Sequence, residues 1–150
     1  MSFARLIASF FGSGYAPRAP GTAGTLAALV PGALMLALAP ALLPLACLLA
    51  CLGGLWAIRA SAVAGDPGWV VIDEAAGMWI TLLGLSHASP LGLLAAFALF
   101  RLLDILKPGP VGWADRQPGA AGIMGDDVIA GALAAGILWA VGARFPGLFG

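Results

Sequence analysis

Charged residues are scarce in this sequence, and the two signs balance. Asp, Glu, Lys and Arg make up 9% of the 150 residues, and the formal net charge at pH 7 is zero. A chain without a basic excess lacks the electrostatic field that holds nucleic acid, so we expect no nucleic-acid partner. Hydrophobic residues make up 61% of the chain, with a mean hydropathy of +1.02, which is more than a small soluble core buries. The composition predicts one membrane-embedded domain, 1–150.

Cysteine and histidine are rare as well. Cys47 and Cys51 lie four residues apart in an apolar run with no histidine or carboxylate near them, which is typical of packing residues. His87 is the one histidine, so a site built from several histidines is excluded. The acidic and basic residues are therefore the main candidates for chemistry.

Long uncharged stretches predict membrane helices. Residues 26–58 carry no charge. As one helix this stretch would be about 50 Å long, whereas the hydrocarbon core of a bilayer is about 30 Å thick. Pro40 and Pro44 offer a break, so we expect two helices, roughly 24–39 and 42–62.

A second uncharged stretch, 75–100, is interrupted by the segment SHASPLG at 86–92. Ser, Pro and Gly in its middle favour a hairpin of two short helices, 73–86 and 90–106, over one tilted span. The hairpin also keeps every Arg and Lys except Arg144 on one side of the membrane, in agreement with the positive-inside tendency.

The two ends of the chain complete the predicted architecture. A Gly- and Pro-rich segment, 107–125, predicts an irregular loop, and a last helix should run from 126 to 144. Near the N-terminus apolar residues recur at helical spacing: Phe3, Leu6, Ile7, Phe10 and Phe11. The sequence therefore predicts an all-α membrane bundle of about four to five short helices with an N-terminal amphipathic helix at the interface.

In this topology the charged helix ends face the same side of the membrane, which the positive-inside tendency makes the cytoplasmic side. The residues at that side are Arg18, Arg59, Asp66, Asp73, Glu74, Arg101, Asp104, Lys107, Asp126 and Asp127. Small residues just inside the carboxylates let the helices approach closely. These are Gly77, Thr81, Gly131 and Ala135. We therefore expect the carboxylates to converge.

Converging carboxylates repel one another, and a cation would offset the repulsion. A site made of oxygen ligands favours a hard cation such as Mg²⁺. Mg²⁺ beside Arg and Lys is typical of sites that act on phosphoryl groups. At the membrane surface such a site would meet the phosphate of a lipid headgroup.

Each group also has a structural interpretation. Acids at 73–74 and 126–127 fit helix caps, because a helix start favours negative charge. Arg101 and Asp104 are three residues apart and fit a structural ion pair. The remaining charges fit solvated loops: Arg59, Asp66, Asp115 and Arg116. The coincidence of the first three groups at one membrane face favours a functional site.

The sequence excludes several kinds of phosphatase. Cys51 and Arg59 enclose seven residues, whereas a cysteine phosphate-binding loop needs five. One histidine is too few for the lipid phosphatases with a histidine nucleophile. The chain has neither the Asp-x-Asp pair of aspartyl-phosphate enzymes of the haloacid type nor the aspartate pattern of the CDP-alcohol transferases.

Four segments carry a resemblance to a known family. They are GSGYAPRAPGTAGT, DPGWVVIDEAAGMW, FRLLDILKPGPVGWADR and GAAGIMGDDVIAG. In this order they resemble the blocks of bacterial phosphatidylglycerophosphatase A. The resemblance implies a multi-pass enzyme of the bacterial cytoplasmic membrane with its active site facing the cytoplasm. It would use Mg²⁺ to hydrolyse the terminal phosphate of phosphatidylglycerophosphate in the cytoplasmic leaflet, giving phosphatidylglycerol and phosphate.

The resemblance also implies the site residues. The ligands of one or two Mg²⁺ ions would be Asp73, Glu74, Asp126 and Asp127, with Asp104 as a further candidate. The catalytic acids would be Asp104, Asp126 and Asp127. Lys107 and Arg101 would bind the phosphate, and Arg18 and Thr22 are weaker candidates. We favour attack by a water that Mg²⁺ and a carboxylate activate; an aspartate nucleophile is the alternative.

Other functions stay open on the sequence alone. The nearest is a phosphatase that acts on other lipid phosphates. A different class is a small cation-transporting membrane protein whose acids line the transport path. A transport path predicts acids at mid-membrane depth, whereas these acids lie at predicted helix ends beside Arg and Lys. A purely structural subunit of a larger complex is a third possibility.

Overall fold

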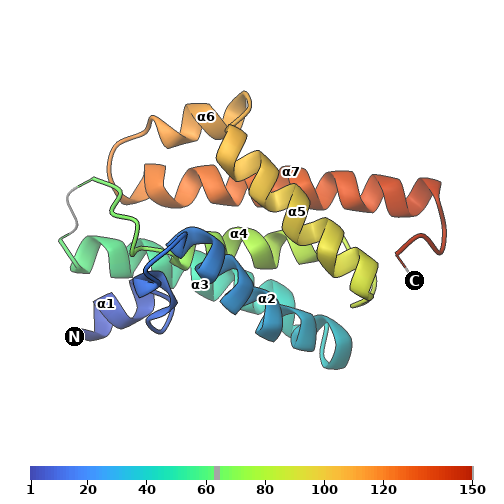
Figure 1. Ribbon diagram of the computed structural model, residues 1–150, viewed down its shortest axis with the longest axis horizontal. Coiled ribbons are helices and arrows are strands. Elements are labelled where there is room, and N and C mark those ends of the chain that lie inside the picture. Colours follow the sequence, from blue (N-terminus) through green and yellow to red (C-terminus); the bar gives the residue numbers. More distant parts are fainter. Residues whose placement is uncertain (63–64, 150) are drawn as a thin grey trace.

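The structure, a computed structural model, describes residues 1–62 and 65–149. In these ranges all regular structure is helical, as the sequence predicts (Figure 1). The elements are α1 (Phe3–Ala8), the 3₁₀ turn η1 (Ser13–Tyr15), α2 (Pro20–Leu38), α3 (Leu42–Ala60), α4 (Ile72–Leu82), α5 (Pro90–Leu106), α6 (Pro110–Asp115) and α7 (Ala120–Arg144).

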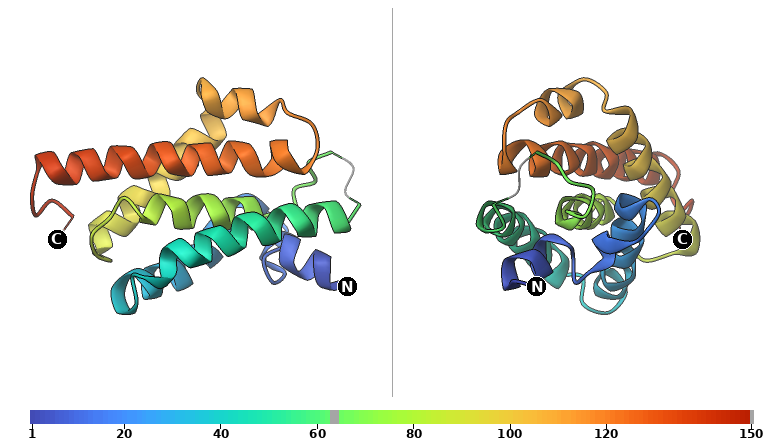
Figure 2. Two further views of the ribbon diagram at one scale, coloured as in Figure 1. Left: turned by 180° about the vertical axis from the view of Figure 1, so that it is seen from behind. Right: turned by 60° about the vertical axis from the view of Figure 1, so that its left-hand side comes forward.

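Helix α4 is the centre of the bundle. Helices α2, α3, α5 and α7 all pack against it, and the two views in Figure 2 show it among them. Eight of its eleven residues are buried, among them Met78 and Leu82. Its start is held in place because the backbone N–H of Val71 donates a hydrogen bond to the carbonyl of Ala8 at 2.9 Å. The first turn of α4 therefore has a fixed position at one end of the bundle.

In the described part of the chain three helices are long and apolar enough to cross a membrane: α2 and α3, with 19 residues each, and α7, with 25. Their outward faces carry exposed leucines such as Leu34, Leu49 and Leu133. Helices α4 and α5 have 11 and 17 residues, fewer than the roughly 20 that a full span needs. The chain is a membrane protein in which longer helices enclose the short α4.

Four predicted helices agree with the structure. The pair 24–39 and 42–62 corresponds to α2 and α3, and the hairpin 73–86 and 90–106 corresponds to α4 and α5. Helix α2 begins earlier than predicted, at Pro20, because proline is well suited to the first position of a helix. The structure thus confirms the breaks at Pro40 and in the segment SHASPLG.

The predicted irregular loop over 107–125 is wrong. Part of it forms α6, and α7 begins at Ala120. Pro110 is the first residue of α6, where its missing N–H loses no hydrogen bond. Gly122 belongs to α7 and lies against the backbone that follows α6. A Cβ at this position would collide with the carbonyl of Gln117. Glycine here serves close packing within a helical region.

The N-terminal helix is shorter than predicted. It ends at Ala8, and Phe10 and Phe11 follow with positive φ angles of 43° and 57°. Phe11 is exposed, but Phe10 is buried, and its ring lies edge-on to Trp79 with the centroids 5.7 Å apart. Phe10 therefore packs into the bundle, and its placement on an interfacial helix face is wrong.

Small residues bring α4 and α7 into backbone contact. A Cβ at Gly77 would lie 2.6 Å from the carbonyl oxygen of Asp127, and a Cβ at Gly131 would collide with the backbone of Gly77. Thr81 donates a 2.8 Å hydrogen bond to the carbonyl of Gly77. Farther along, a Cβ at Gly84 would collide with the backbone of Ala135. The predicted close approach is confirmed.

This contact predicts opposite effects for the same substitution at two glycines of α7. Gly131→Ala should lower the free energy of unfolding by about 1–3 kcal/mol, because the new methyl group has no room against α4. A methyl group at Gly136 would meet no atom within 4 Å, so Gly136→Ala should raise stability by up to about 1 kcal/mol through helix propensity. Thermal unfolding in detergent measures both, and equal effects would contradict the packing.

Candidate active site

Charged side chains gather around one cavity of about 300 Å³. The cavity lies between the start of α2, the first turn of α4, the end of α5 and the second turn of α7. Its charged lining residues are Asp66, Asp73, Glu74, Arg101, Asp104, Lys107, Asp126 and Asp127. The sequence predicts this convergence, and the structure confirms it for these residues.

The four central carboxylates come from two helices. Asp73 and Glu74 lie in the first turn of α4, where the helix dipole favours negative charge. Asp126 and Asp127 lie farther into their helix than predicted, because α7 starts at Ala120. Their interpretation as caps at the start of a helix is therefore wrong. They are buried within α7 and need another partner.

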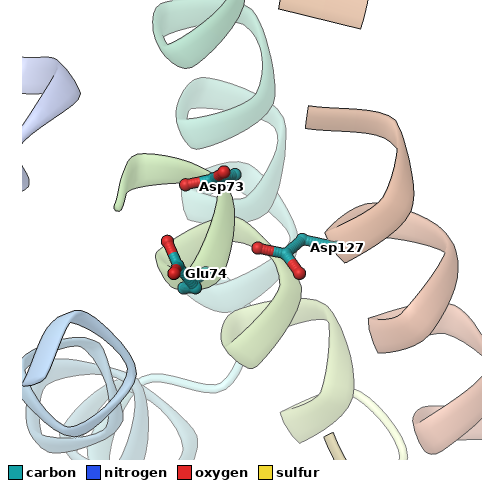
Figure 3. Close-up of side chains that lie close together, drawn as sticks. All are labelled: Asp73, Glu74 and Asp127. Carbon is teal, nitrogen blue, oxygen red and sulfur yellow. The ribbon is translucent and has the colours of Figure 1, made fainter. Parts of the chain in front are cut away.

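The carboxylates form two groups that have Asp127 in common. In the first group one carboxylate oxygen each of Asp73, Glu74 and Asp127 lie within 4.8 Å of one another. Figure 3 shows Asp127 on α7 with its carboxylate directed toward these two acids on α4. In the second group the same limit holds for Asp104, Asp126 and Asp127. Separations of this size suit a cation held between several oxygen ligands.

Four carboxylate oxygens in the cavity are buried without a hydrogen-bond partner. They are Asp73 Oδ1, Glu74 Oε2, Asp126 Oδ1 and Asp127 Oδ1. An unpaired buried carboxylate costs several kcal/mol, and neighbouring carboxylates add mutual repulsion. Oxygen-only donors are the ligands that Mg²⁺ and other hard cations prefer. The residues present therefore fit a divalent cation.

Two basic side chains stand at the edge of the acidic cluster. Arg101 forms an ion pair with Asp104, and its Nε is buried without a hydrogen-bond partner. Lys107 ends α5 and donates hydrogen bonds to Asp115 and, at 2.6 Å, to Asp126. The predicted ion pair of Arg101 and Asp104 is thus present, and both residues also line the cavity.

Lys107 is held as a cation in an unusual backbone conformation. Partial burial alone would lower the pKa of Lys107, but its hydrogen bonds to Asp115 and Asp126 outweigh burial and raise that pKa above its usual value. Its φ is +47°, in the left-handed region that a residue with a side chain rarely adopts. Such strain is typical of functional positions, and here it ends α5 beside the acids.

Some site residues differ from the sequence prediction. Arg18 is exposed, and neither it nor Thr22 is among the residues that line the cavity. Asp66 and Asp115 are exposed, as expected, but Asp66 also lines the cavity and Asp115 pairs with Lys107.

The sequence reasoning also missed Gly21. This residue lines the cavity, and a Cβ there would collide with the carboxylate of Glu74. The sequence signal for Gly21 was its position directly after Pro20, the first residue of α2.

Comparisons with known proteins agree with this site. The family described as phosphatidylglycerophosphatase A matches residues 6–142. The chain is 41% identical to phosphatidylglycerophosphatase A of Escherichia coli K12, over 94% of this chain and 84% of the relative. It is 39% identical to phosphatidylglycerophosphatase A of Haemophilus influenzae, over 91% and 86%. It is also 42% identical to a putative phosphatidylinositol-3-phosphatase of Bacteroides thetaiotaomicron, over 84% and 85%. No solved structure matches the chain.

The unpartnered oxygens predict that a divalent cation stabilises the folded protein. Saturating Mg²⁺ should raise the melting temperature in detergent by several degrees relative to EDTA, because a ligand at 100 times its Kd adds about 2.7 kcal/mol. Asp73→Asn should remove most of that increase, since it weakens the first group. An equal Mg²⁺ effect in Asp73→Asn and in the wild type would contradict the ligand assignment.

Proposed function

The chain belongs to the phosphatidylglycerophosphatase A family and is a phosphatase acting on phosphoric monoesters, and we propose that its substrate is phosphatidylglycerophosphate, hydrolysed with Mg²⁺. The products are phosphatidylglycerol and inorganic phosphate. The observation that carries the proposal is the set of buried, unpartnered carboxylate oxygens from α4 and α7 beside Arg101 and Lys107. Such a site suits a phosphate dianion and a hard cation.

The ligands we propose for Mg²⁺ are Asp73, Glu74, Asp126 and Asp127, with Asp104 within reach of the last two. When bound, Mg²⁺ would offset part of the negative charge of these carboxylates and would withdraw charge from the phosphate oxygens. The protein supplies a cavity in which the acids already converge, so little reorganisation is needed for binding. The close contact of α4 with α7 keeps the two pairs of acids together.

Arg101 and Lys107 are the proposed phosphate-binding residues. Both line the cavity, and the side chain of Lys107 is 31% exposed, so it is accessible to a headgroup entering from the membrane surface. Arg101 pairs with Asp104, and Lys107 pairs with Asp126. These carboxylates orient the two basic side chains before the substrate arrives. The basic side chains stabilise the charge that the phosphoryl group carries in the transition state. Arg18 and Thr22 have a weaker claim, because they are not among the lining residues.

In the proposed reaction a water attacks phosphorus while a cavity carboxylate, Asp104, Asp126 or Asp127, accepts its proton. The bond between phosphorus and the glycerol oxygen breaks, and that oxygen takes up a proton to become the hydroxyl of phosphatidylglycerol. Because the site lies at the ends of the membrane helices, the acyl chains of the substrate stay in the bilayer during this step. We propose that the site faces the cytoplasm across the bacterial inner membrane, since most Arg and Lys lie at this end.

Direct attack by water predicts inversion of configuration at phosphorus. A phosphorothioate substrate that carries two different oxygen isotopes on its terminal phosphorus, hydrolysed in water of the third isotope, releases chiral inorganic thiophosphate, and phosphorus NMR reports its configuration. Inversion is expected because one in-line displacement occurs. Retention would show two displacements and therefore an aspartyl-phosphate intermediate.

Phosphate release from defined lipids tests the proposed substrate. The protein in detergent micelles should release phosphate from phosphatidylglycerophosphate with Mg²⁺ and none with excess EDTA. Phosphatidic acid and phosphatidylinositol 3-phosphate should react far more slowly. Asp127→Asn should lose at least about 100-fold in kcat, a loss typical of removing a preorganised group that stabilises transition-state charge. His87→Ala, at an exposed position outside the cavity, serves as the control.

The outcomes of that assay separate the competing functions. Similar release from all three lipids would replace the specific substrate by lipid phosphomonoesters in general; one of the three, phosphatidylinositol 3-phosphate, is the substrate that the name of the Bacteroides relative gives. Release that EDTA does not affect would contradict the Mg²⁺ requirement. No release from any lipid would contradict the proposed substrate, and the transport alternative would then be tested by measuring Mg²⁺ flux in liposomes.

Lys107→Ala should raise KM and lower kcat together. Lys107 binds the phosphate, and that interaction strengthens as charge develops in the transition state. Lys107→Arg should recover part of the lost kcat/KM, because the charge is kept but the geometry changes. Steady-state kinetics with phosphatidylglycerophosphate measure both variants. An unchanged kcat/KM in Lys107→Ala would place Lys107 outside the phosphate site.

A further inference from the structure

We propose that the acidic cavity binds two divalent cations and that Asp127 is a ligand of both. The inference rests on the proposed function and adds to it the number of ions and the role of one residue. Its geometric basis is the pair of carboxylate groups that have Asp127 in common. Asp73 and Glu74 belong only to the first group, and Asp104 and Asp126 belong only to the second.

The unpartnered oxygens are distributed over both groups. One ion in the first group would bind one carboxylate oxygen each of Asp73, Glu74 and Asp127, which are three of the four acids with an unpartnered oxygen. It would leave Asp126 Oδ1 without a partner. Water cannot easily replace that partner, because the side chain of Asp126 is only 9% exposed. A second ion between Asp126, Asp104 and Asp127 removes that penalty.

The charge balance also favours two ions. The charged residues that line the cavity are six carboxylates and two cationic side chains, Arg101 and Lys107, so four negative charges are left over. One divalent cation would still leave the cavity negative, and a phosphomonoester with a charge of about −1.5 to −2 at pH 7 would be repelled. Two divalent cations bring the charge of the cavity to zero, which removes that repulsion.

The two positions should differ in affinity. In the first group none of the three acids forms an ion pair with Lys or Arg in the described part of the chain. In the second group Arg101 pairs with Asp104, and Lys107 pairs with Asp126. An incoming cation there meets electrostatic repulsion from both side chains. The first position therefore fills at lower metal concentration than the second.

Mn²⁺ binding to the full-length protein in detergent tests the inference without measuring activity. Equilibrium dialysis counts the ions, and low-temperature electron paramagnetic resonance detects spin coupling between two Mn²⁺ ions that have a common carboxylate ligand. We expect two ions of unequal affinity and a coupled spectrum in the wild type. Asp104→Asn should bind one ion with an uncoupled spectrum, and Asp127→Asn should lose the coupling.

His87→Ala is the control for ion number, because His87 is exposed, does not line the cavity and belongs to neither group. Circular dichroism and gel filtration establish that each variant is folded. One ion in the wild type, two uncoupled ions, or a coupled pair that persists in Asp127→Asn would each overturn the inference. If one ion binds and the lipid is still hydrolysed, the proposed function stands. If no ion binds and EDTA leaves hydrolysis unchanged, the proposed Mg²⁺ requirement fails as well.

Discussion

The contact between α4 and α7 is the constraint on which the site depends. Glycines at 77 and 131 let the two backbones meet, and that contact places Asp127 against the first turn of α4. Several carboxylates thereby become buried near one another without hydrogen-bond partners. This arrangement is unfavourable for an apolar bundle by itself, and the proposed cation would offset that cost. The contact of α4 with α7 therefore accounts both for close packing in the middle of the bundle and for the cluster of acids at its end.

The fold separates anchoring in the membrane from chemistry. Helices α2, α3 and α7 present apolar outer surfaces of sufficient length to cross a bilayer. The shorter α4 is enclosed by its neighbours, and its N-terminal acids line the cavity inside the bundle. Loops and helix ends supply the remaining polar residues at one end of the bundle. A lipid phosphatase with this arrangement can act on a headgroup while the acyl chains stay in the bilayer.

The helix pattern and most of the site could be predicted from the sequence, because both depend on local signals. Uncharged runs and prolines indicated the helices, and the positive-inside tendency favoured the hairpin that brings the acids to one end. Helix 120–125 and α6 were missed because glycines that break helices in isolation are here required for close packing. For the same reason Asp126 and Asp127 were placed at a helix start. The contacts of Asp115 with Lys107 and of Gly21 with Glu74 are tertiary, and spacing alone does not predict them.

The most direct test of the proposed site is to locate the metal. Crystals of the protein grown with Mn²⁺ would show the ion by anomalous diffraction at the manganese edge. We expect density between α4 and α7, bonded to Asp127 and to Asp73 or Glu74 at about 2.0–2.3 Å, typical of a hard cation and carboxylate oxygen. A catalytically active crystal form with these carboxylates unliganded, or with Mn²⁺ bound only elsewhere, would contradict the assignment.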